Sequence, residues 1–432
     1  MKQVPVVVAL AAALSSVAPF AWAQAHRESA AREATVRNPS DANASLALGR
    51  VLRRAGAYDA ALAELRRGSM LPAARAVPIS TRMRREIALA YLDQGKFQPA
   101  MTACRQLLGL QGAEALAHVC IAETHMLHKR ATEALPEIAK AQALSPALYE
   151  AKVVEGYARW QEGSTSQAEA AFRSAGAADS SRPEAWLGLG RFLLANTRKT
   201  EALDAFEKAV SADSEGPDAL YALASGLPAT ERSATLLRQA VTGRPSFGAA
   251  HARLAEVLFG LSRLQDAEQE ARASLQCPGV ESDWHVILGE IQLRRGQAAD
   301  ALQAAQAALK LVANNARAKL LLADAHAARH DIDLAIEAWQ ASFNLAHTNP
   351  TPLVHGALGC LANQRETTAK AFADRATQGF PQHAPAWDAA GDVAAKAGDK
   401  TAARAAWTKA IAATDGTVVR DAIRRKIATL KE

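Results

Sequence analysis

The stretch that decides the fold begins Pro183-Glu-Ala-Trp186-Leu-Gly-Leu189-Gly190 and continues to Ala209. A proline suits the first turn of a helix, where its missing N–H would have had no partner within the helix. Trp186, Leu189 and Gly190 follow at spacings of three and four, which places them on one helix face. The stretch therefore predicts the start of an amphipathic helix.

A second helix is predicted directly downstream, because Ala202, Phe206 and Ala209 share a face by the same spacing. Gly190 and Ala202 are small enough to let two helix backbones approach closely, and Phe206 with Trp186 would fill the remaining space. One such hairpin cannot bury its apolar face alone, so neighbouring hairpins must stack on it.

Alanine recurs along the chain at a fixed step of 34 residues. It does so at Ala100, Ala134, Ala168 and Ala202 and, after one interruption, at Ala267, Ala301, Ala335, Ala369 and Ala403. Glycine often marks the break between the two predicted helices of a unit, at Gly56, Gly95, Gly163, Gly296 and Gly398. Glycine can end a helix in the left-handed conformation without a Cβ clash. A fixed period of this length indicates a stack of helical repeats.

The composition agrees with a helical chain. Hydrophobic residues make up 49% of the 432 residues, which excludes a disordered chain, and aromatics make up only 5%, which argues against β-sandwiches and barrels. The net charge of +6 is small for this length, so no nucleic-acid partner is predicted. Four cysteines are too few for a disulfide scaffold.

These units resemble tetratricopeptide repeats (TPR), whose pattern has a large residue, Leu-Gly, an aromatic, Ala, an aromatic, Ala and Pro over about 34 positions. The resemblance extends from about Asp41 to Asp415 and covers roughly eleven units. It implies an all-α, right-handed superhelical solenoid of stacked helix-turn-helix repeats over residues 41–416. A capping helix is predicted over residues 417–432, with apolar residues at Val418, Val419, Ile423, Ile427 and Leu430.

Three units depart from the repeat. The unit over residues 218–244 is short, and Gly226-Leu227-Pro228 is expected to end its first helix early. In the unit over residues 351–381, Leu358-Gly359 is out of phase with the recurring alanine. The first unit is longer than the period and is expected to carry an extra loop over residues 73–80.

Residues 1–23 resemble a secretory signal peptide. Lys2 precedes the apolar run over residues 6–14, and Ala21-Trp22-Ala23 gives a small-x-small pattern before Gln24. The run is too short to cross a bilayer, so cleavage between Ala23 and Gln24 is predicted, with an uncleaved anchor as the alternative. A lead segment over residues 24–40 would follow, with no membrane span in the mature chain. The predicted location is outside the cytosol, in the periplasm of a Gram-negative bacterium.

Candidate chemical sites are few. His326 and His330 have the i, i+4 spacing that can bind zinc, but position 327 is alanine where a metalloprotease has its base, which favours packed or exposed histidines. His118, His125 and His128 form a second cluster, with His118 and His125 at positions of large core residues. The sequence contains no glycine-rich phosphate loop, nucleophile elbow or H-E-x-x-H motif. We therefore expect no catalytic residue, metal or cofactor, and no enzyme.

Cys104 and Cys120 are predicted to lie on adjacent helices of consecutive units. In an oxidising compartment the two thiols could pair. The interpretation favoured by sequence is that they are two small buried hydrophobic residues.

The resemblance implies that the chain binds proteins or peptides along an inner surface lined by the first helix of each repeat. Carried over by alignment, the groove runs from basic residues through aromatic ones to acidic ones, with Tyr157 and Trp160 as the expected anchor. The groove residues are Arg50, Arg53, Arg54, Arg82, Arg85, Tyr157, Trp160, Tyr221, Phe259, Glu256, Glu290, Asp324 and Asp392. A charged first-helix face that is simply solvated is the alternative.

With the export prediction, this implies a non-catalytic periplasmic scaffold in the assembly of an envelope structure, such as a pilus, secretion or export machinery. The alternative is a carbohydrate-handling subunit of an exopolysaccharide export system. That alternative predicts exposed aromatic side chains along the groove.

Overall fold

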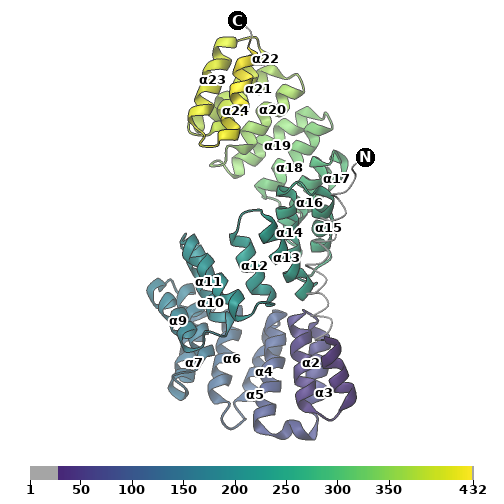
Figure 1. Cartoon of the computed structure of the whole chain (residues 1–432), viewed down its shortest axis with the longest axis vertical. Coiled ribbons are helices and arrows are strands. Elements are labelled where there is room, and N and C mark those ends of the chain that lie inside the picture. Colours follow the sequence, from purple (N-terminus) through teal and green to yellow (C-terminus); the bar gives the residue numbers. More distant parts are fainter. Residues whose placement is uncertain (1–27, 431–432) are drawn as a thin grey trace, which may run out of the picture. The chain divides into compact units, whose positions relative to one another are not determined.

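The computed structural model describes residues 28–430, which form helices and contain no strand. The predicted signal peptide and its cleavage site at Ala23 and Gln24 lie outside the described residues. Helical hairpins follow one another along the chain, so the predicted all-α solenoid is confirmed (Figure 1). Within residues 28–430, no helix has the length and apolarity needed to cross a membrane. The chain divides into two compact units, one ending at Val257 and the other beginning at Leu258.

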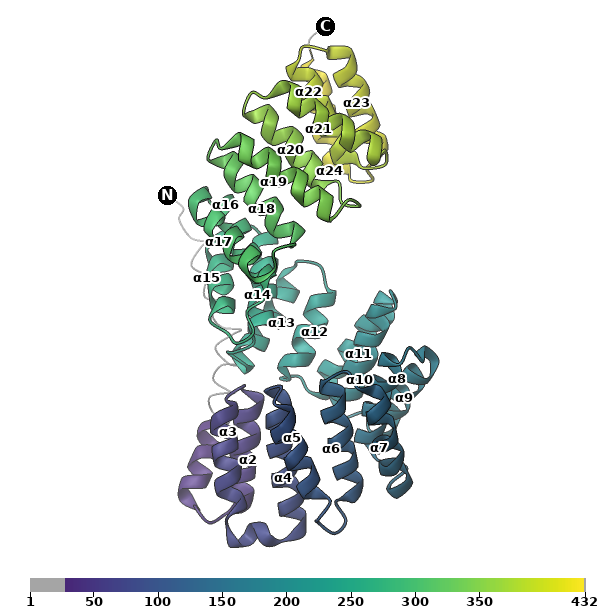
Figure 2. The ribbon, with the colours of Figure 1, turned by 180° about the vertical axis from the view of Figure 1, so that it is seen from behind.

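Unit 1 begins with a helix over residues 28–37 and continues as paired helices (Figures 1 and 2). In chain order these are α2 (Ala42–Arg54), α3 (Tyr58–Ser69), the 3-10 helix η1 (Pro72–Arg75), α4 (Val77–Asp93), α5 (Phe97–Leu107), α6 (Glu114–Leu127), α7 (Ala131–Leu144), α8 (Tyr149–Gln161), α9 (Thr165–Ala178), α10 (Pro183–Ala195), α11 (Lys199–Ala212), α12 (Pro217–Gly226) and α13 (Glu231–Gly243).

The division between the units falls within α14 (Gly248–Gly260). Unit 2 contains the same kind of paired helices and ends in a single helix. They are α15 (Leu264–Leu275), α16 (Ser282–Arg294), α17 (Ala298–Leu311), α18 (Ala316–Ala328), α19 (Ile332–Leu345), α20 (Thr351–Ala362), α21 (Glu366–Gly379), α22 (Ala384–Lys396), α23 (Lys400–Ala412) and α24 (Thr417–Thr429).

The hairpin of α10 and α11 packs as its sequence predicts. Ala202 and Phe206 are 1% and 2% exposed, and a Cβ added at Gly190 would lie 2.4 Å from the Phe206 ring. The same contact joins Gly391 to Trp407 in the hairpin of α22 and α23. Only a glycine leaves room for the ring there, because protein interiors are close-packed.

The turns inside all of the described hairpins but that of α12 and α13 share one backbone conformation. A residue with positive φ recurs at the repeat period, at positions 95, 129, 163 and 197 and again at 262, 296, 330, 364 and 398. The predicted glycine breaks are confirmed, since Gly56, Gly95, Gly163, Gly296 and Gly398 have φ between 68° and 84°. In five further hairpins this left-handed position is held by Lys129, Thr197, Ser262, His330 and Gln364, whereas the turn between α12 and α13 has no residue with positive φ.

Thr197→Gly is expected to raise the free energy of unfolding by about 1 kcal/mol, because a β-branched residue is sterically strained in the left-handed region. Thr197 has φ 61° in the turn between α10 and α11. The reverse change, Gly163→Thr, is expected to lower it by a similar amount, since Gly163 has φ 84° in the preceding turn. Urea denaturation followed by circular dichroism measures both, and a destabilised Thr197→Gly protein would contradict the prediction.

Two departures from the repeat have different outcomes. The early end of the first helix in the unit over residues 218–244 is confirmed, because α12 ends at Gly226. The loop expected over residues 73–80 is wrong. The segment folds into η1, and α4 already begins at Val77 with Pro78 in its first turn, where proline is favoured.

The unit over residues 351–381 forms the regular hairpin of α20 and α21. Gly356, rather than the out-of-phase Gly359, takes the glycine position against the second helix, where its Cβ would lie 2.8 Å from Phe372. Gly359 instead lies against Trp339 of the preceding hairpin. The out-of-phase Leu-Gly pair therefore serves a contact between repeats.

Helix α24 packs on the last hairpin. Ile423 is 1% exposed, and Ile427 and Leu430 pack in the same cluster as Trp407. Val418 and Val419 are 78% and 47% exposed, so the expectation that they belong to the apolar face is wrong. They lie in the first turn of α24, ahead of the part that contacts α23.

Candidate functional site

The first helices of the unit 1 hairpins line a groove of about 820 Å³. Its lining residues come mainly from α2, α4, α6, α8 and the start of α10. Tyr149 is the only aromatic among the described lining residues. Six arginines and five carboxylates dominate the lining: Arg50, Arg53, Arg54, Arg82, Arg85, Arg182, Glu86, Glu123, Glu150, Glu184 and Asp213.

Glu86 on α4 forms ion pairs with two arginines of α2. Its carboxylate accepts from Arg50 Nε at 2.7 Å and from Arg53 Nε at 3.0 Å, while Arg53 Nη1 donates to Asp93 at 2.6 Å. Glu86 is 6% exposed, so the carboxylate is held away from water with its charge matched. Burial lowers the pKa of Arg53, but the combined effect of Asp93 and Glu86 is larger and raises the pKa above its ordinary value.

Arg85 makes the equivalent contact one repeat later. Its Nη1 and Nη2 donate to the two carboxylate oxygens of Glu123 on α6, at 2.5 and 2.7 Å. This parallel two-bond geometry is the strongest form of an arginine–carboxylate pair. The side chains of Arg85 and Glu123 are only 13% and 23% exposed, so the pair joins first helices of successive repeats beneath the groove surface.

Tyr149 and Arg182 form the far wall of the groove. The Arg182 guanidinium lies 4.0 Å from the Tyr149 ring centroid and donates to Glu150 at 2.8 Å. The Tyr149 hydroxyl accepts from the backbone N–H of Ala185 at 2.9 Å. The hydroxyl lies 3.3 Å from both the Arg182 carbonyl oxygen and a Glu184 carboxylate oxygen, to which it can donate, and burial raises the pKa of Tyr149.

Two arginines in the groove keep their charge available. Arg82 on α4 is exposed and makes no hydrogen bond or ion pair with any described residue. Arg54, whose side chain is 64% exposed, approaches the Asp213 carboxylate only to 3.9 Å. The groove can therefore offer guanidinium groups to a partner without breaking its internal pairs.

A contact between distant hairpins borders the groove, and we call it the closure contact. Arg244, at the end of α13, donates from Nε to the Arg54 carbonyl oxygen at 3.1 Å. Its two Nη groups donate to the Asp218 carboxylate at 3.2 and 2.7 Å. A Cβ at Gly56 would lie 3.6 Å from the Ser246 Cβ. The closure contact joins the first hairpin of unit 1 to its sixth, so the groove is bounded on this side.

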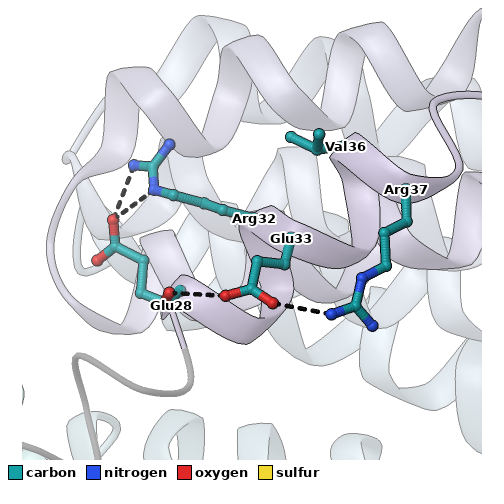
Figure 3. A pocket seen from close by; sticks show the side chains of 6 residues that line it. Glu28, Arg32, Glu33, Val36 and Arg37 are labelled. Atoms are coloured by element: carbon teal, nitrogen blue, oxygen red, sulfur yellow. Dashed lines mark hydrogen bonds and ion pairs between the residues drawn. The ribbon is translucent and has the colours of Figure 1, made fainter.

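A second hollow, of about 650 Å³, lies along the helix over residues 28–37 (Figure 3). All of its described lining residues come from that helix. Its charged side chains bond to one another, with Arg32 donating to Glu28 and Arg37 to Glu33 one turn apart, and Val36 beside them (Figure 3). Among residues 28–430, no polar group of another element lines the hollow, so we do not treat it as a candidate site.

Comparison with known families identifies the repeat. The family described as "Tetratricopeptide repeat" matches residues 20–69, 153–217, 218–280 and 288–343. The chain belongs to the tetratricopeptide repeat family. Such repeats indicate a scaffold for protein–protein interaction, which agrees with a groove lined by first helices. None of the curated proteins compared with the chain matches it in sequence.

Several solved tetratricopeptide-repeat structures resemble the chain. A human IFIT1 dimer with m7Gppp-AAAA is 15% identical, covers 81% of this chain and 90% of its own, and has a TM-score of 0.50. Yeast Tom70 is 11% identical, with coverages of 90% and 95% and a TM-score of 0.44. PilW, a widely conserved type IV pilus biogenesis factor, is 18% identical, with coverages of 48% and 98% and a TM-score of 0.42. At these identities the likeness concerns the fold alone.

The arginines predicted for the tetratricopeptide-repeat groove all line it, but they differ in availability. Carboxylates of Glu86, Asp93 or Glu123 accept hydrogen bonds from Arg50, Arg53 and Arg85. The side chains of Arg54 and Arg82 are exposed. The basic N-terminal section expected from sequence is therefore only partly available, because carboxylates about one repeat away pair with Arg50, Arg53 and Arg85.

The expected aromatic anchor is not an open surface. Tyr157 packs edge-on against Phe172 with ring centroids 5.0 Å apart, and Trp160 packs edge-on against Phe192 at 5.7 Å. Both are half-buried against the core of unit 1, and neither lines the groove. The helical spacing that suggested a groove position also fits the side of a first helix that meets the next hairpin.

The later predicted residues are also engaged in contacts within the chain. Tyr221 packs against Phe247 with centroids 4.9 Å apart, and Phe259 is half-buried in α14. In unit 2, Glu290 accepts from Arg317 at 2.7 Å. Asp324 accepts from the Trp339 indole N–H at 2.7 Å. The acidic section is therefore partly neutralised by cations and donors of neighbouring helices.

His355 on α20 is expected to make the stability of unit 2 depend on pH. Its Nδ1 lies 2.8 Å from Asp324 Oδ2, and this hydrogen bond raises the pKa of His355, although burial opposes the shift. Glu290 is the other charged group that acts on the ring. Protonated His355 therefore contributes stability below its ordinary pKa of about 6.5, and the contribution is lost as pH rises through the raised value.

Thermal denaturation of the wild type and His355→Gln at about pH 6 and pH 8 measures this effect. The difference between the thermal unfolding midpoints of the wild type and His355→Gln should be smaller at about pH 8 than at about pH 6. Since the side chain is 42% exposed, the contribution is less than about 1 kcal/mol. A gap that widens with pH would contradict the assignment.

The histidines of the two predicted clusters lie beside carboxylates or in a turn of the fold. His326 lies 3.5 Å from Asp331, and His330 occupies the left-handed turn position with φ 66°. His118 Nδ1 lies 2.6 Å from Glu137 of α7. Across residues 28–430, no three His, Cys, Asp or Glu side chains are grouped so that they could hold a metal ion.

Cys104 on α5 and Cys120 on α6 form a disulfide with Cα atoms 5.4 Å apart. The sequence-based preference for two unpaired buried thiols is wrong. Both residues are fully buried, as that interpretation assumed, but the stacking of consecutive repeats also brings their sulfur atoms together.

Sequence reasoning missed the carboxylates of the groove and the closure contact. Glu86 and Glu123 face arginines that lie 33 and 38 residues earlier in the chain, close to one repeat length. Opposite charges about one period apart on first helices are a signal that could have identified these pairs. No comparable signal exists for Arg244 and Arg54, which are 190 residues apart.

Proposed function

We propose that the chain is an exported, non-catalytic scaffold whose unit 1 groove binds a segment of a partner protein during assembly of an envelope structure. The observation that carries the proposal is the groove of about 820 Å³, whose wall comes from successive first helices. Stacked repeats present extended concave surfaces of this kind to their partners.

The internal ion pairs suit such a groove because they fix its shape in advance. The Arg50–Glu86, Arg53–Glu86 and Arg85–Glu123 bonds hold α2, α4 and α6 in register. Less entropy is then lost in ordering the site when a partner binds, which improves affinity. Arg54 and Arg82 remain to steer a segment with negative charge, mainly through the association rate.

Export is supported by two features. The apolar run over residues 6–14 has the length of a signal-peptide core. The Cys104–Cys120 disulfide belongs to an oxidising compartment, since such bonds are rare in the cytosol. We therefore propose the periplasm of a Gram-negative bacterium as the location of the mature protein. N-terminal sequencing of the purified protein should begin at Gln24, and a start at Met1 would contradict this.

Site-directed photo-crosslinking in the native cell tests the groove. A photoreactive phenylalanine derivative in place of Arg82 should form a crosslink to a discrete partner, because Arg82 is exposed in the groove. The matched control places the same derivative at Lys199, which is exposed on the second helix α11 outside the groove. Equal crosslinking at both positions would exclude the groove as the binding site.

Charge reversal supplies an independent measurement with the captured partner. Arg54→Glu with Arg82→Glu should slow association and flatten its salt dependence, because both side chains carry exposed charge in the groove. Arg75→Glu with Arg105→Glu changes the net charge equally and alters exposed residues outside the groove. Arg85 is unsuitable for reversal, since a glutamate there would face Glu123 and destabilise the fold.

The structure offers no observation in favour of the carbohydrate-handling alternative. That function would need exposed aromatic rings along the groove for stacking against sugars. The only aromatic among its described lining residues is Tyr149, which is buried and covered by Arg182.

A further inference from the structure

A separate pocket of about 610 Å³ lies on the other side of α4 from the groove, and we call it the outer pocket. Second helices α3 and α5 contribute Arg66 and Thr102, and α4 contributes Arg84 between them. The two sides of α4 differ in their residues: Arg82, Arg85 and Glu86 line the groove, whereas Arg84 lines the outer pocket with Tyr91.

The outer pocket owes part of its wall to the longer connection between the first two repeats. Ala74 of η1 and Ser80 in the early part of α4 line it, and both belong to the segment that makes this unit longer than the repeat period. The family pattern has no counterpart for this segment. The pocket is therefore a property of this chain rather than of the repeat.

The charges of the outer pocket are all of one sign. Its described lining residues include Arg66 and Arg84 and no carboxylate. Arg66 donates to the Tyr91 hydroxyl, and Arg84 Nη1 donates to the Gln106 carbonyl oxygen at 3.1 Å. These acceptors are neutral and occupy few of the five N–H donors of each guanidinium. The groove arginines Arg53 and Arg85, by contrast, are bonded to carboxylates.

The remaining lining suits a peptide rather than a bare ion. Met83 and Ile87 supply an apolar floor, and Met83 is fully buried. Gln98 and Gln106 add amide groups that can bond to a peptide backbone. A volume of about 610 Å³ holds several side chains. A planar guanidinium matches the two oxygens of a carboxylate.

We propose that the outer pocket binds an acidic peptide segment of a protein partner, with Arg66 and Arg84 each bonded to a side-chain carboxylate. This site is distinct from the groove and does not depend on it. A scaffold with both sites could hold two segments at once, on opposite faces of α4.

Fluorescence anisotropy with a labelled hexaglutamate peptide and the full mature chain tests the proposal. Saturable binding is expected, and Arg66→Gln with Arg84→Gln should weaken it about tenfold or more, since both charge-assisted bonds to the peptide carboxylates are lost. Arg66→Lys with Arg84→Lys should give an intermediate loss, because lysine keeps the charge and loses the two-pronged geometry. Labelled hexaglutamine and hexalysine peptides should not bind.

The matched control is Arg75→Gln with Arg105→Gln, which removes the same charge from exposed positions that do not line the outer pocket. An equal loss in this control would attribute binding to net charge and overturn the proposal, as would the absence of saturable binding by the wild type. Displacement by inorganic phosphate at matched ionic strength would also overturn the peptide assignment. Co-sedimentation of the protein with phosphatidylglycerol vesicles that requires Arg66 and Arg84 would likewise overturn the peptide assignment.

Two readouts keep this test separate from that of the groove. Unchanged thermal midpoints of the Arg→Lys variant show that the fold is intact. Photo-crosslinking from position 82 should survive Arg66→Gln with Arg84→Gln, because Arg82 lies on the groove side of α4. Loss of peptide binding with intact crosslinking is the expected result, and simultaneous loss of both would contradict two independent sites.

Discussion

Replacing Glu123 by alanine is expected to lower the free energy of unfolding by roughly 3–5 kcal/mol, because it leaves the charge of Arg85 without its partner below the groove surface. Arg85 is 13% exposed and makes both of its hydrogen bonds of the pair to the Glu123 carboxylate. Glu86 and Glu150 are close enough to interact with Arg85, but neither takes the place of those bonds. Urea denaturation measured by circular dichroism gives the loss.

A double-mutant cycle separates the cost of an unpaired charge from the value of the pair. Arg85→Met with Glu123→Leu should recover most of the stability, since apolar residues of similar volume often replace a buried ion pair at little cost. Glu133→Ala is the matched single control, because Glu133 is exposed on the neighbouring helix α7. A loss below about 1 kcal/mol for Glu123→Ala would place this pair among ordinary surface ion pairs.

Removing the disulfide is expected to cost about 3 kcal/mol, because Cys104 and Cys120 close a loop with a sequence separation of 16. The change Cys104→Ala with Cys120→Ala should lower the unfolding midpoint, and dithiothreitol should lower that of the wild type in the same direction. The bond joins α5 to α6, so the damage should concentrate where the second and third repeats stack. Hydrogen exchange of the two helices locates it.

Thiol counting and a matched cysteine variant control this measurement. The denatured, unreduced protein should have two reactive thiols, those of Cys277 and Cys360, which are buried and lie outside the disulfide. Cys277→Ala with Cys360→Ala should leave the effect of dithiothreitol on the midpoint unchanged. A count of four thiols in protein purified from the periplasm would contradict the disulfide.

Both predictions concern the coupling of repeats rather than the repeats themselves. The Arg85–Glu123 pair joins the first helices of consecutive hairpins, and the disulfide joins a second helix to the next first helix. In a stack of repeats, stability depends on such nearest-neighbour interfaces. The same contacts hold the groove and the outer pocket in shape, so loss of either is expected to weaken binding as well as folding.

The repeat and its hairpin packing could be predicted from sequence because they depend on neighbours within one period. Gly190 and Phe206 belong to the same repeat, and helical spacing alone places them on facing sides of two adjacent helices. The left-handed turns were predicted for the same reason wherever glycine marks them. At Thr197 the turn is equally left-handed, but the residue type gives no sign of it.

The candidate sites were only partly predictable, because helical spacing does not distinguish a first-helix side that faces the groove from one that faces the next hairpin. The groove arginines were found, but Tyr157 and Trp160 were assigned to the groove when they pack against Phe172 and Phe192. The outer pocket was missed because the segment expected as a loop over residues 73–80 folds into η1 and the start of α4.

The sequence by itself determined the all-α repeat, its period and the glycine turns, since each follows from short-range spacing and backbone sterics. Only the tertiary structure decided which charges are available. Glu86 pairs with Arg50 and Arg53, whereas the described acceptors of Arg66 and Arg84 are the neutral Tyr91 hydroxyl and Gln106 carbonyl oxygen. The closure contact between Arg244 and Arg54 likewise depends on the accumulated curvature of six hairpins, which no local pattern records. Small rotations between repeats add along the stack, so contacts between its distant members arise only when the whole unit is folded.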